Sequence, residues 1–185
     1  MKNPFIWADS LIIERVFEPF AWWVEYHFGK NNFWLARAVL LLKFFCDFLQ
    51  YSMFATLGSP LNWLSIAINF VVVTMLCASS FLLERSSSGK GMANPLRISP
   101  AWIGLRILST ASFICILIFS WLPIMVRIIT YEPELYGLLI PVGLAVVGSI
   151  VWPLHFYFLA CSRVPPEWKK ARDEKLAQKL ALQLT

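Results

Sequence analysis

Charged and amide side chains interrupt the first long apolar run of the chain. Lys43 and Asp47 are four residues apart, so they share one helix face, which Gln50 extends. Asn62 and Asn69 lie on a polar stripe of the next apolar run. At about 1.5 Å per residue, Asp47 and Asn69 lie about 15 Å and about 12 Å from the turn that joins the two runs. The pattern predicts a polar cluster between two antiparallel helices that pack as a hairpin.

Two interpretations of this polar cluster compete. In the structural one, Lys43 and Asp47 neutralise each other, and the amides form hydrogen bonds between helices that are worth about 0.6 kcal/mol each. In the functional one, the same residues line an ion or proton path in an oligomer. A charge at this depth costs at least about 2.5 kcal/mol, so in either case the cluster must face protein or water. We favour the structural interpretation.

Other chemistry has few candidate residues. The two histidines, His27 and His155, lie in different segments, and the sequence contains no Cys-x-x-Cys, His-Glu-x-x-His or Gly-x-Ser-x-Gly motif. Asp47 has no second acid within the apolar runs with which to carry out general acid–base catalysis. We therefore expect a protein that is not an enzyme and that has no metal site and no cofactor.

Four continuous apolar runs dominate the sequence, at residues 33–57, 61–83, 107–126 and 135–160. About 20 helical residues cross a bilayer, and each run meets that length. Strands of a membrane barrel alternate apolar and polar residues, which these runs do not. The sequence thus predicts an all-α integral membrane protein with a four-helix bundle over residues 33–161. The first run is the least apolar, because it carries three charged residues.

The basic residues predict the orientation of this bundle. Most of the 16 Lys and Arg residues lie before residue 33, between 85 and 100, or after residue 161. With four spans these segments share one side, and positively charged segments stay in the cytoplasm. Both termini and the 85–100 loop, a flexible connector by composition, are therefore expected there.

Contact with anionic lipid accounts for the net charge of +5 without a nucleic-acid partner. Absence of any Asn-x-Ser/Thr sequon fits a bacterial inner membrane.

Residues 1–32 predict an amphipathic cytoplasmic segment at the membrane surface. Asp9 and Ser10 are candidate caps for a helix that runs to about Phe28 and kinks at Pro19. An interfacial anchor is one interpretation of this helix. An acidic face offered to a cytoplasmic partner or a neighbouring subunit is the other, because anionic-lipid-binding helices usually carry basic residues instead. That acidic face consists of Glu14, Glu18 and Glu25.

Residues 162–185 predict a basic cytoplasmic helix that follows Pro165 and Pro166. Isolated helices of this length are marginal in water, so the apolar stripe of this helix requires a contact. The membrane surface, the same helix of a sister subunit, and a soluble partner are the alternatives. The stripe includes Leu176, Leu180 and Leu184.

Small residues in the last apolar run predict close helix packing. Side chains of this size let a neighbouring backbone approach within a membrane. The residues in question are Gly143, Ala145, Gly148 and Ser149.

These features together favour a non-enzymatic multi-pass membrane subunit that forms a homo-oligomer within the lipid bilayer. Its two amphipathic cytoplasmic ends would anchor or scaffold a cytoplasmic protein partner. The alternative is an ion-conducting or membrane-permeabilising effector whose oligomer encloses the Lys43, Asp47 and Asn69 face. Small defence or phage-exclusion proteins offer an analogy for that alternative.

Overall fold

The computed structural model describes residues 4–55, 61–87, 95–131, 133–162 and 166–183, and helices make up almost all of them. The N-terminal half contains α1 (Pro4–Ile12), the π-helix η1 (Ile13–Phe17), α2 (Glu18–Phe28), α3 (Asn32–Ala55) and α4 (Leu61–Ser87). The C-terminal half contains α5 (Pro95–Ile98), α6 (Pro100–Ile116), the π-helix η2 (Leu117–Trp121), α7 (Leu122–Tyr131), the 3-10 helix η3 (Pro133–Leu138), α8 (Leu139–Ala160) and α9 (Pro166–Gln183). The expected all-helical class is confirmed for this part of the chain.

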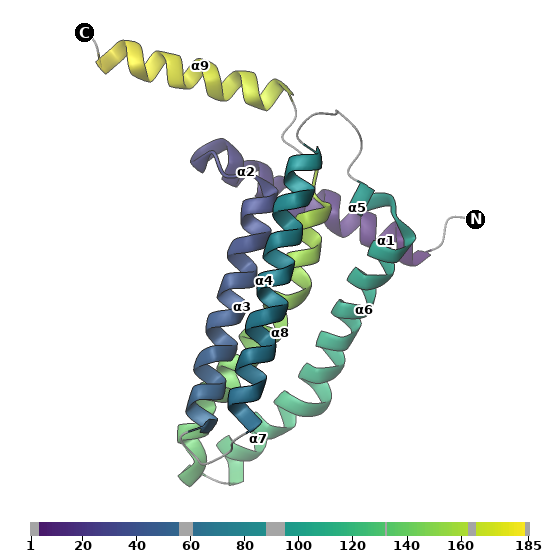
Figure 1. Ribbon diagram of the computed structural model, residues 1–185, viewed down its shortest axis with the longest axis vertical. Coiled ribbons are helices and arrows are strands. Elements are labelled where there is room, and N and C mark those ends of the chain that lie inside the picture. The colour runs from purple at the N-terminus through teal and green to yellow at the C-terminus, as the bar shows by residue number, and fades with distance from the viewer. Residues whose placement is uncertain (1–3, 56–60, 88–94, 132, 163–165, 184–185) are drawn as a thin grey trace.

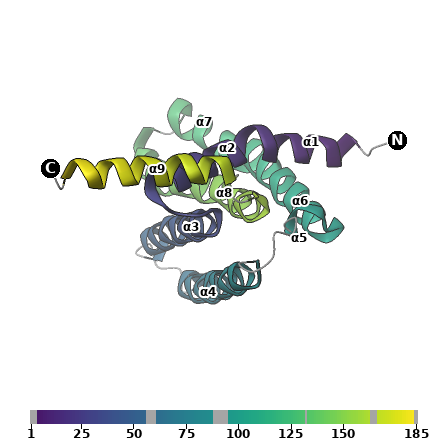
Figure 2. The ribbon, with the colours of Figure 1, turned by 90° about the horizontal axis from the view of Figure 1, so that it is seen from above.

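The long helices form a bundle with one covered end. α3 lies between α4 and α8 and packs most extensively on α8 (Figures 1 and 2). α6, η2 and α7 form one long rod that packs on α8 and diverges from α4 (Figure 1). α1, η1 and α2 lie across one end of the bundle, called here the capped end (Figure 2). α9 extends beyond this end (Figure 1).

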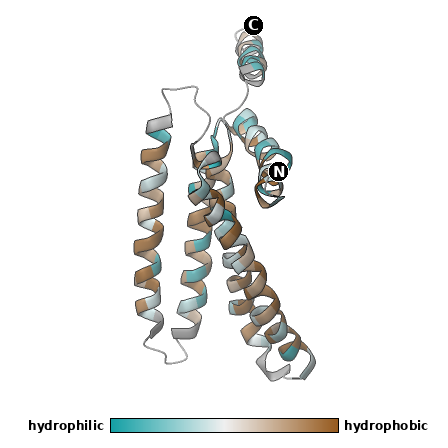
Figure 3. Ribbon diagram, turned by 90° about the vertical axis from the view of Figure 1, so that its right-hand side faces the viewer, coloured by the Kyte–Doolittle hydropathy of each residue, from teal (hydrophilic) through white to brown (hydrophobic). Residues whose placement is uncertain are grey.

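Three helical stretches in the described part are long and apolar enough to cross a membrane: Trp63–Arg85, Pro100–Tyr131 and Tyr136–Ala160. Apolar residues predominate along these helices (Figure 3). α3, which carries three charged residues, is not among the stretches found in the described residues. A multi-pass membrane protein is thus supported, and the first of the four expected spans stays a prediction.

The N-terminal helix starts earlier than expected, and the π-helix η1 interrupts its regular α-helical geometry. It begins at Pro4, so Asp9 is an interior residue instead of a helix cap. Pro19 lacks the N–H that would continue the regular hydrogen-bond pattern, and the π-helix η1 ends two residues before it. The helix ends at Gly29, whose φ of +66° is the left-handed conformation that glycine adopts without a steric penalty.

The most buried side chains lie at the capped end. A hydrophobic cluster joins η1 and α2 to the start of α3, to α5 and to the last residues of α8. Within it, the ring of Phe17 stacks on Tyr157 with centroids 4.7 Å apart. By contrast, many large apolar side chains along α4, α6 and α7 are exposed on this chain. The capped end therefore has a packed core of its own, whereas the rest of the bundle presents apolar surface suited to lipid.

The segment expected to be a flexible connector is partly helical. α4 continues to Ser87, and α5 begins at Pro95. Leu96 is buried in the core cluster, so burial orders the second part of this connector against its Gly- and Ser-rich composition. Residues 88–94 lie outside the described residues.

Candidate functional site

Lys43, Asp47 and Asn69 meet between α3 and α4. The ammonium group of Lys43 and the side-chain amide of Asn69 both donate to Oδ2 of Asp47. Asp47 is 7% exposed, so this carboxylate is held by protein groups. The antiparallel pairing of the two helices brings Asn69 to the depth of Asp47. The side chain of Asn62 lies outside the described residues.

These polar groups line a cavity of about 620 Å³ between α3, α4, α6, η2 and α8. Gln50, which is buried, belongs to the same wall. Aromatic rings form part of the remaining wall, and the lining residues Ile68 of α4 and Ile116 of α6 are exposed on this chain. Sequence reasoning missed these contributors, because a serine or a tryptophan in an apolar run does not indicate which helix it faces. They are Ser109, Ser112, Phe113, Trp121 and Trp152.

A glycine of α8 allows this approach of the helices. A Cβ atom at Gly148 would lie 2.9 Å from Oδ1 of Asp47, which is closer than real Cβ atoms approach. Ala145 is buried one turn earlier, and the hydroxyl of Ser149 donates to its carbonyl oxygen at 2.8 Å. A Cβ atom at Gly143 would meet nothing within 4 Å. Of the small residues singled out in α8, Gly148 is thus the one that requires its size at this site.

Lys43 has a second contact, on α8. Its Nζ lies 5.4 Å from the centroid of the Trp152 ring, within the range of a cation–π interaction. The neighbouring wall contains the indole N–H of Trp121, which is buried and has no hydrogen-bond partner among the described residues. The cavity therefore combines a neutralised ion pair with at least one unused donor.

Nearer the capped end than the cavity, α3 and α8 remain in close contact. Leu40 and His155 are completely buried there. The Nδ1–H of His155 donates to the carbonyl oxygen of Ala36 at 3.0 Å, which ties α8 to α3.

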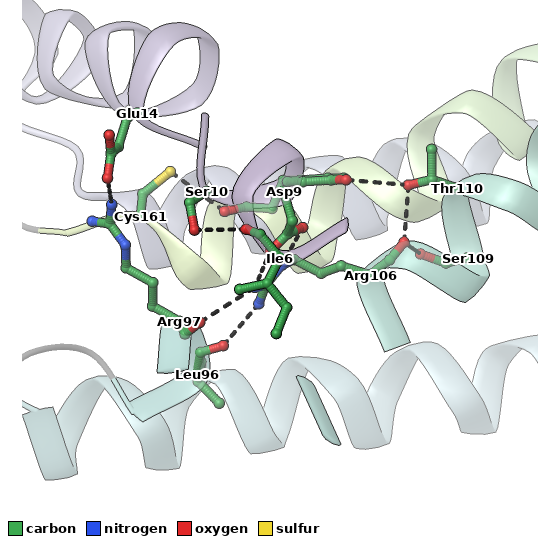
Figure 4. Close-up of polar contacts among 11 residues, drawn as sticks. Ile6, Asp9, Ser10, Glu14, Leu96, Arg97, Arg106, Ser109, Thr110 and Cys161 are labelled. Atoms are coloured by element: carbon green, nitrogen blue, oxygen red, sulfur yellow. Dashed lines mark hydrogen bonds and ion pairs between the residues drawn. The ribbon is translucent and has the colours of Figure 1, made fainter. Parts of the chain in front are cut away.

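A second set of charges fastens the N-terminal helix to the bundle (Figure 4). The Nε atom of Arg106 lies 3.1 Å and 3.2 Å from the two carboxylate oxygens of Asp9, and its Nη2 lies 2.5 Å from Oδ2. Its Nη1 donates to the Leu96 carbonyl oxygen at 2.8 Å. The side chains of Arg106 and Asp9 are 1% and 3% exposed. The free-energy cost of removing both charges from water is offset only because nearly all polar atoms of the pair form hydrogen bonds.

The acidic face of the N-terminal helix is largely occupied within the chain. Arg97 donates to Glu14 at 2.5 Å and to Glu18 at 2.8 Å. Glu18 also accepts from the backbone N–H of Ser162 at 3.0 Å and is 5% exposed. Glu25 lies two turns further along α2 and is half-buried. Sequence reasoning missed Arg97, because its connector carries no pattern that pairs it with this helix.

α9 touches the rest of the molecule at α2. The Nζ of Lys175 lies 5.3 Å from the ring centroid of Tyr26. Leu176 is 51% exposed and lies in a groove between α9 and the end of α2, so the first member of the apolar stripe is only partly covered. The side chains of Leu180 and Leu184 lie outside the described residues.

Comparison with protein-family models, with curated proteins and with solved structures finds no match to this chain. In the described residues, no group of three or more His, Cys, Asp and Glu side chains is placed to hold a metal ion. The fold and the site define the class: a helical protein with several helices suited to cross a membrane and a largely buried ion pair in a cavity between them.

Proposed function

We propose that this protein is a non-enzymatic membrane scaffold that anchors a cytoplasmic partner through α9. The supporting observation is the position of α9, which extends from the capped end with Leu176 exposed (Figure 1). A helix of 18 residues is marginal by itself in water. A partner that covers its apolar stripe stabilises the helix and gains affinity from the same contact.

Four spans form part of this proposal, with α3 as the first. Its 24 residues extend about 36 Å, which exceeds the hydrocarbon thickness of about 30 Å. Its charges have internal partners: Lys43 pairs with Asp47, and Arg37 donates to Glu84 at 2.7 Å. Packing between α4 and α8 further shields α3 from lipid (Figure 2).

The capped end would face the cytoplasm of a bacterial cell, in contact with the inner membrane. The basic residues before α3, after α4 and in α9 support this orientation. The exposed aromatic side chains of α1 and α2, among them Trp7 and Trp23, suit the headgroup zone. α1 and α2 thus form a platform that lies on lipid and is fixed to the bundle by Arg97 and Arg106.

Topology is tested by a cysteine at the end of α4. In Ser87→Cys we expect no reaction with a membrane-impermeant maleimide added outside intact cells, and full reaction after the cells are opened. The native Cys161 near the same end contributes little signal, because burial raises the pKa of its thiol, as does the carboxylate of Glu18, against the opposing effect of Arg97 and Arg106. Reaction of the new cysteine in intact cells would reverse the proposed orientation.

The scaffold role is tested by removing the apolar stripe. Leu176→Ser, Leu180→Ser and Leu184→Ser together should leave membrane insertion intact and abolish co-purification of the partner. Each buried leucine is worth about 1.5–3 kcal/mol. The matched control should assemble normally, because it places three serines at exposed positions on the opposite face of α9: Ala171→Ser, Glu174→Ser and Gln178→Ser. Quantitative comparison of the two purified complexes decides, and unchanged assembly of the leucine variant contradicts the scaffold role.

The homo-oligomer is a separate part of the proposal. The exposed apolar faces of the long helices supply surface for a second copy, although lipid suits the same surface. Chemical cross-linking in native membranes measures it directly. The leucine variant of α9 then distinguishes assembly through the tail, which it would abolish, from assembly through the spans, which it would leave intact.

The second candidate function is an ion-conducting or membrane-permeabilising effector, and the cavity beside Asp47 and Lys43 favours it. A path between α3 and α8 toward the capped end would have to pass the layer formed by Leu40 and His155, which are completely buried. Conduction would therefore require either a rearrangement of that layer or an oligomer that encloses a different path. We rank it second for this reason.

A further inference from the structure

The cavity between α4 and α6 has the chemistry of a binding site for a lipid-soluble molecule. It lies among the long apolar helices, and residues that line it from α4 and α6, among them Ile68, Val72 and Ile116, are exposed on this chain. A molecule dissolved in the bilayer can enter on that side. Its volume of about 620 Å³ is within the range of pockets that bind small molecules, about 300–1,000 Å³.

The charge of the wall selects against an ionic ligand. Lys43 and Asp47 are the cavity's charged residues, and they neutralise each other. A ligand with a net charge would lose its hydration without gaining a counter-charge in the cavity. An uncharged head group avoids that cost.

One residue of the wall has a hydrogen-bond donor without a partner in the described part of the chain, and others have spare protons. The buried N–H of Trp121 has no partner among the described residues, and a buried unpaired donor is unfavourable. The ammonium group of Lys43 has three protons, of which one is directed at Asp47. The amide of Asn69 has a second N–H besides the one donated to Asp47. A ligand with hydrogen-bond-accepting oxygens complements these donors.

The shape of the wall indicates a flat head and an apolar tail. Phe113, Trp121 and Trp152 supply rings against which a planar head can stack. Ile68, Val72 and Ile116 line the same cavity with apolar side chains. The tail can follow these residues into the lipid.

We propose that this cavity binds an uncharged amphiphile whose planar, carbonyl-bearing head accepts hydrogen bonds from Trp121 and Lys43 while its apolar tail extends between α4 and α6. The inference is independent of the scaffold role of α9. The most direct probe is decylubiquinone, which combines two ring carbonyls with a decyl chain. 1-Phenyldecane has the same chain length and a ring without carbonyls.

The experiment titrates each probe into the full-length purified protein in detergent micelles, at matched mole fractions, and follows thermal unfolding. A ligand that binds the folded state raises the unfolding temperature in a saturable manner. We expect a saturable rise with decylubiquinone and none with 1-phenyldecane. Equal rises with both probes would mean that the cavity takes up apolar groups only, and no rise with either would exclude amphiphile binding; both results overturn the proposal.

Two substitutions locate the site. Trp121→Phe removes the indole N–H but keeps an aromatic ring, and we expect it to weaken the decylubiquinone midpoint about tenfold. The matched control is Trp63→Phe, which alters an exposed tryptophan of α4 and should leave the midpoint unchanged. Ser112→Phe fills the cavity and should abolish the response. Loss of affinity in Trp63→Phe, or wild-type binding by Ser112→Phe, would place the binding elsewhere and refute the proposal.

Discussion

Asp9→Leu is expected to destabilise the folded protein by about 3–5 kcal/mol, because it leaves the guanidinium of Arg106 buried without a counter-charge. The double variant Asp9→Leu with Arg106→Met should recover most of this loss, since no unpaired charge remains. Unfolding in mixed micelles with increasing dodecyl sulfate measures both changes.

Glu14→Gln is the control for this comparison. It removes another carboxylate that faces an arginine from the same helix, but the Glu14 side chain is 57% exposed. Solvent weakens such a pair, so the expected change is about 0–1 kcal/mol. Equal effects of Asp9→Leu and Glu14→Gln would mean that the buried pair with Arg106 does not hold the N-terminal helix in place.

Asp47→Asn is expected to lower stability by a similar amount, about 3–5 kcal/mol, because Lys43 loses its counter-charge within the bundle. A further Lys43→Met should restore stability if the pair is structural. The same unfolding assay measures both variants.

The double variant of Lys43 and Asp47 also separates the two candidate functions. A scaffold should retain its complex with the partner in this variant, and liposomes that contain the wild-type protein should show no ion flux above those without protein. Flux through the wild type that disappears in a stable, assembled double variant would reverse our ranking and make conduction the function.

The polar cluster could be predicted from the sequence because its members are separated by few residues along the chain. Lys43 and Asp47 are one helical turn apart, and Asn69 lies 22 residues after Asp47 in the next apolar run, so counting residues brings the three together. The all-helical class and the apolar helices follow from continuous hydropathy for the same reason. The helix against which α3 packs most was not accessible, because Gly148 lies far along the chain in a helix that is apolar on most sides.

The contacts of the capped end were not predictable from local patterns. Asp9 has the residue type and spacing of a helix cap, and nothing near it in the sequence indicates a pairing with Arg106. Glu18 belongs to an acidic stripe that resembles a solvated face, yet Arg97 and Ser162 contact it from two other segments. Charges whose partners come from distant segments carry no periodic signal.

The ion pair between α1 and α6 also bears on how the chain is assembled as it is made. Asp9 and Arg106 are separated by 97 residues, so at about 5–20 residues per second Asp9 leaves the ribosome about 5–20 s before its partner. During that interval α3 and α4 are synthesised, while the exposed aromatic side chains of α1 and α2 suit a resting place on the membrane surface. Docking of the N-terminal helix is therefore a late step of biogenesis, because its contacts in α6 and at the end of α8 are made only after α3 and α4.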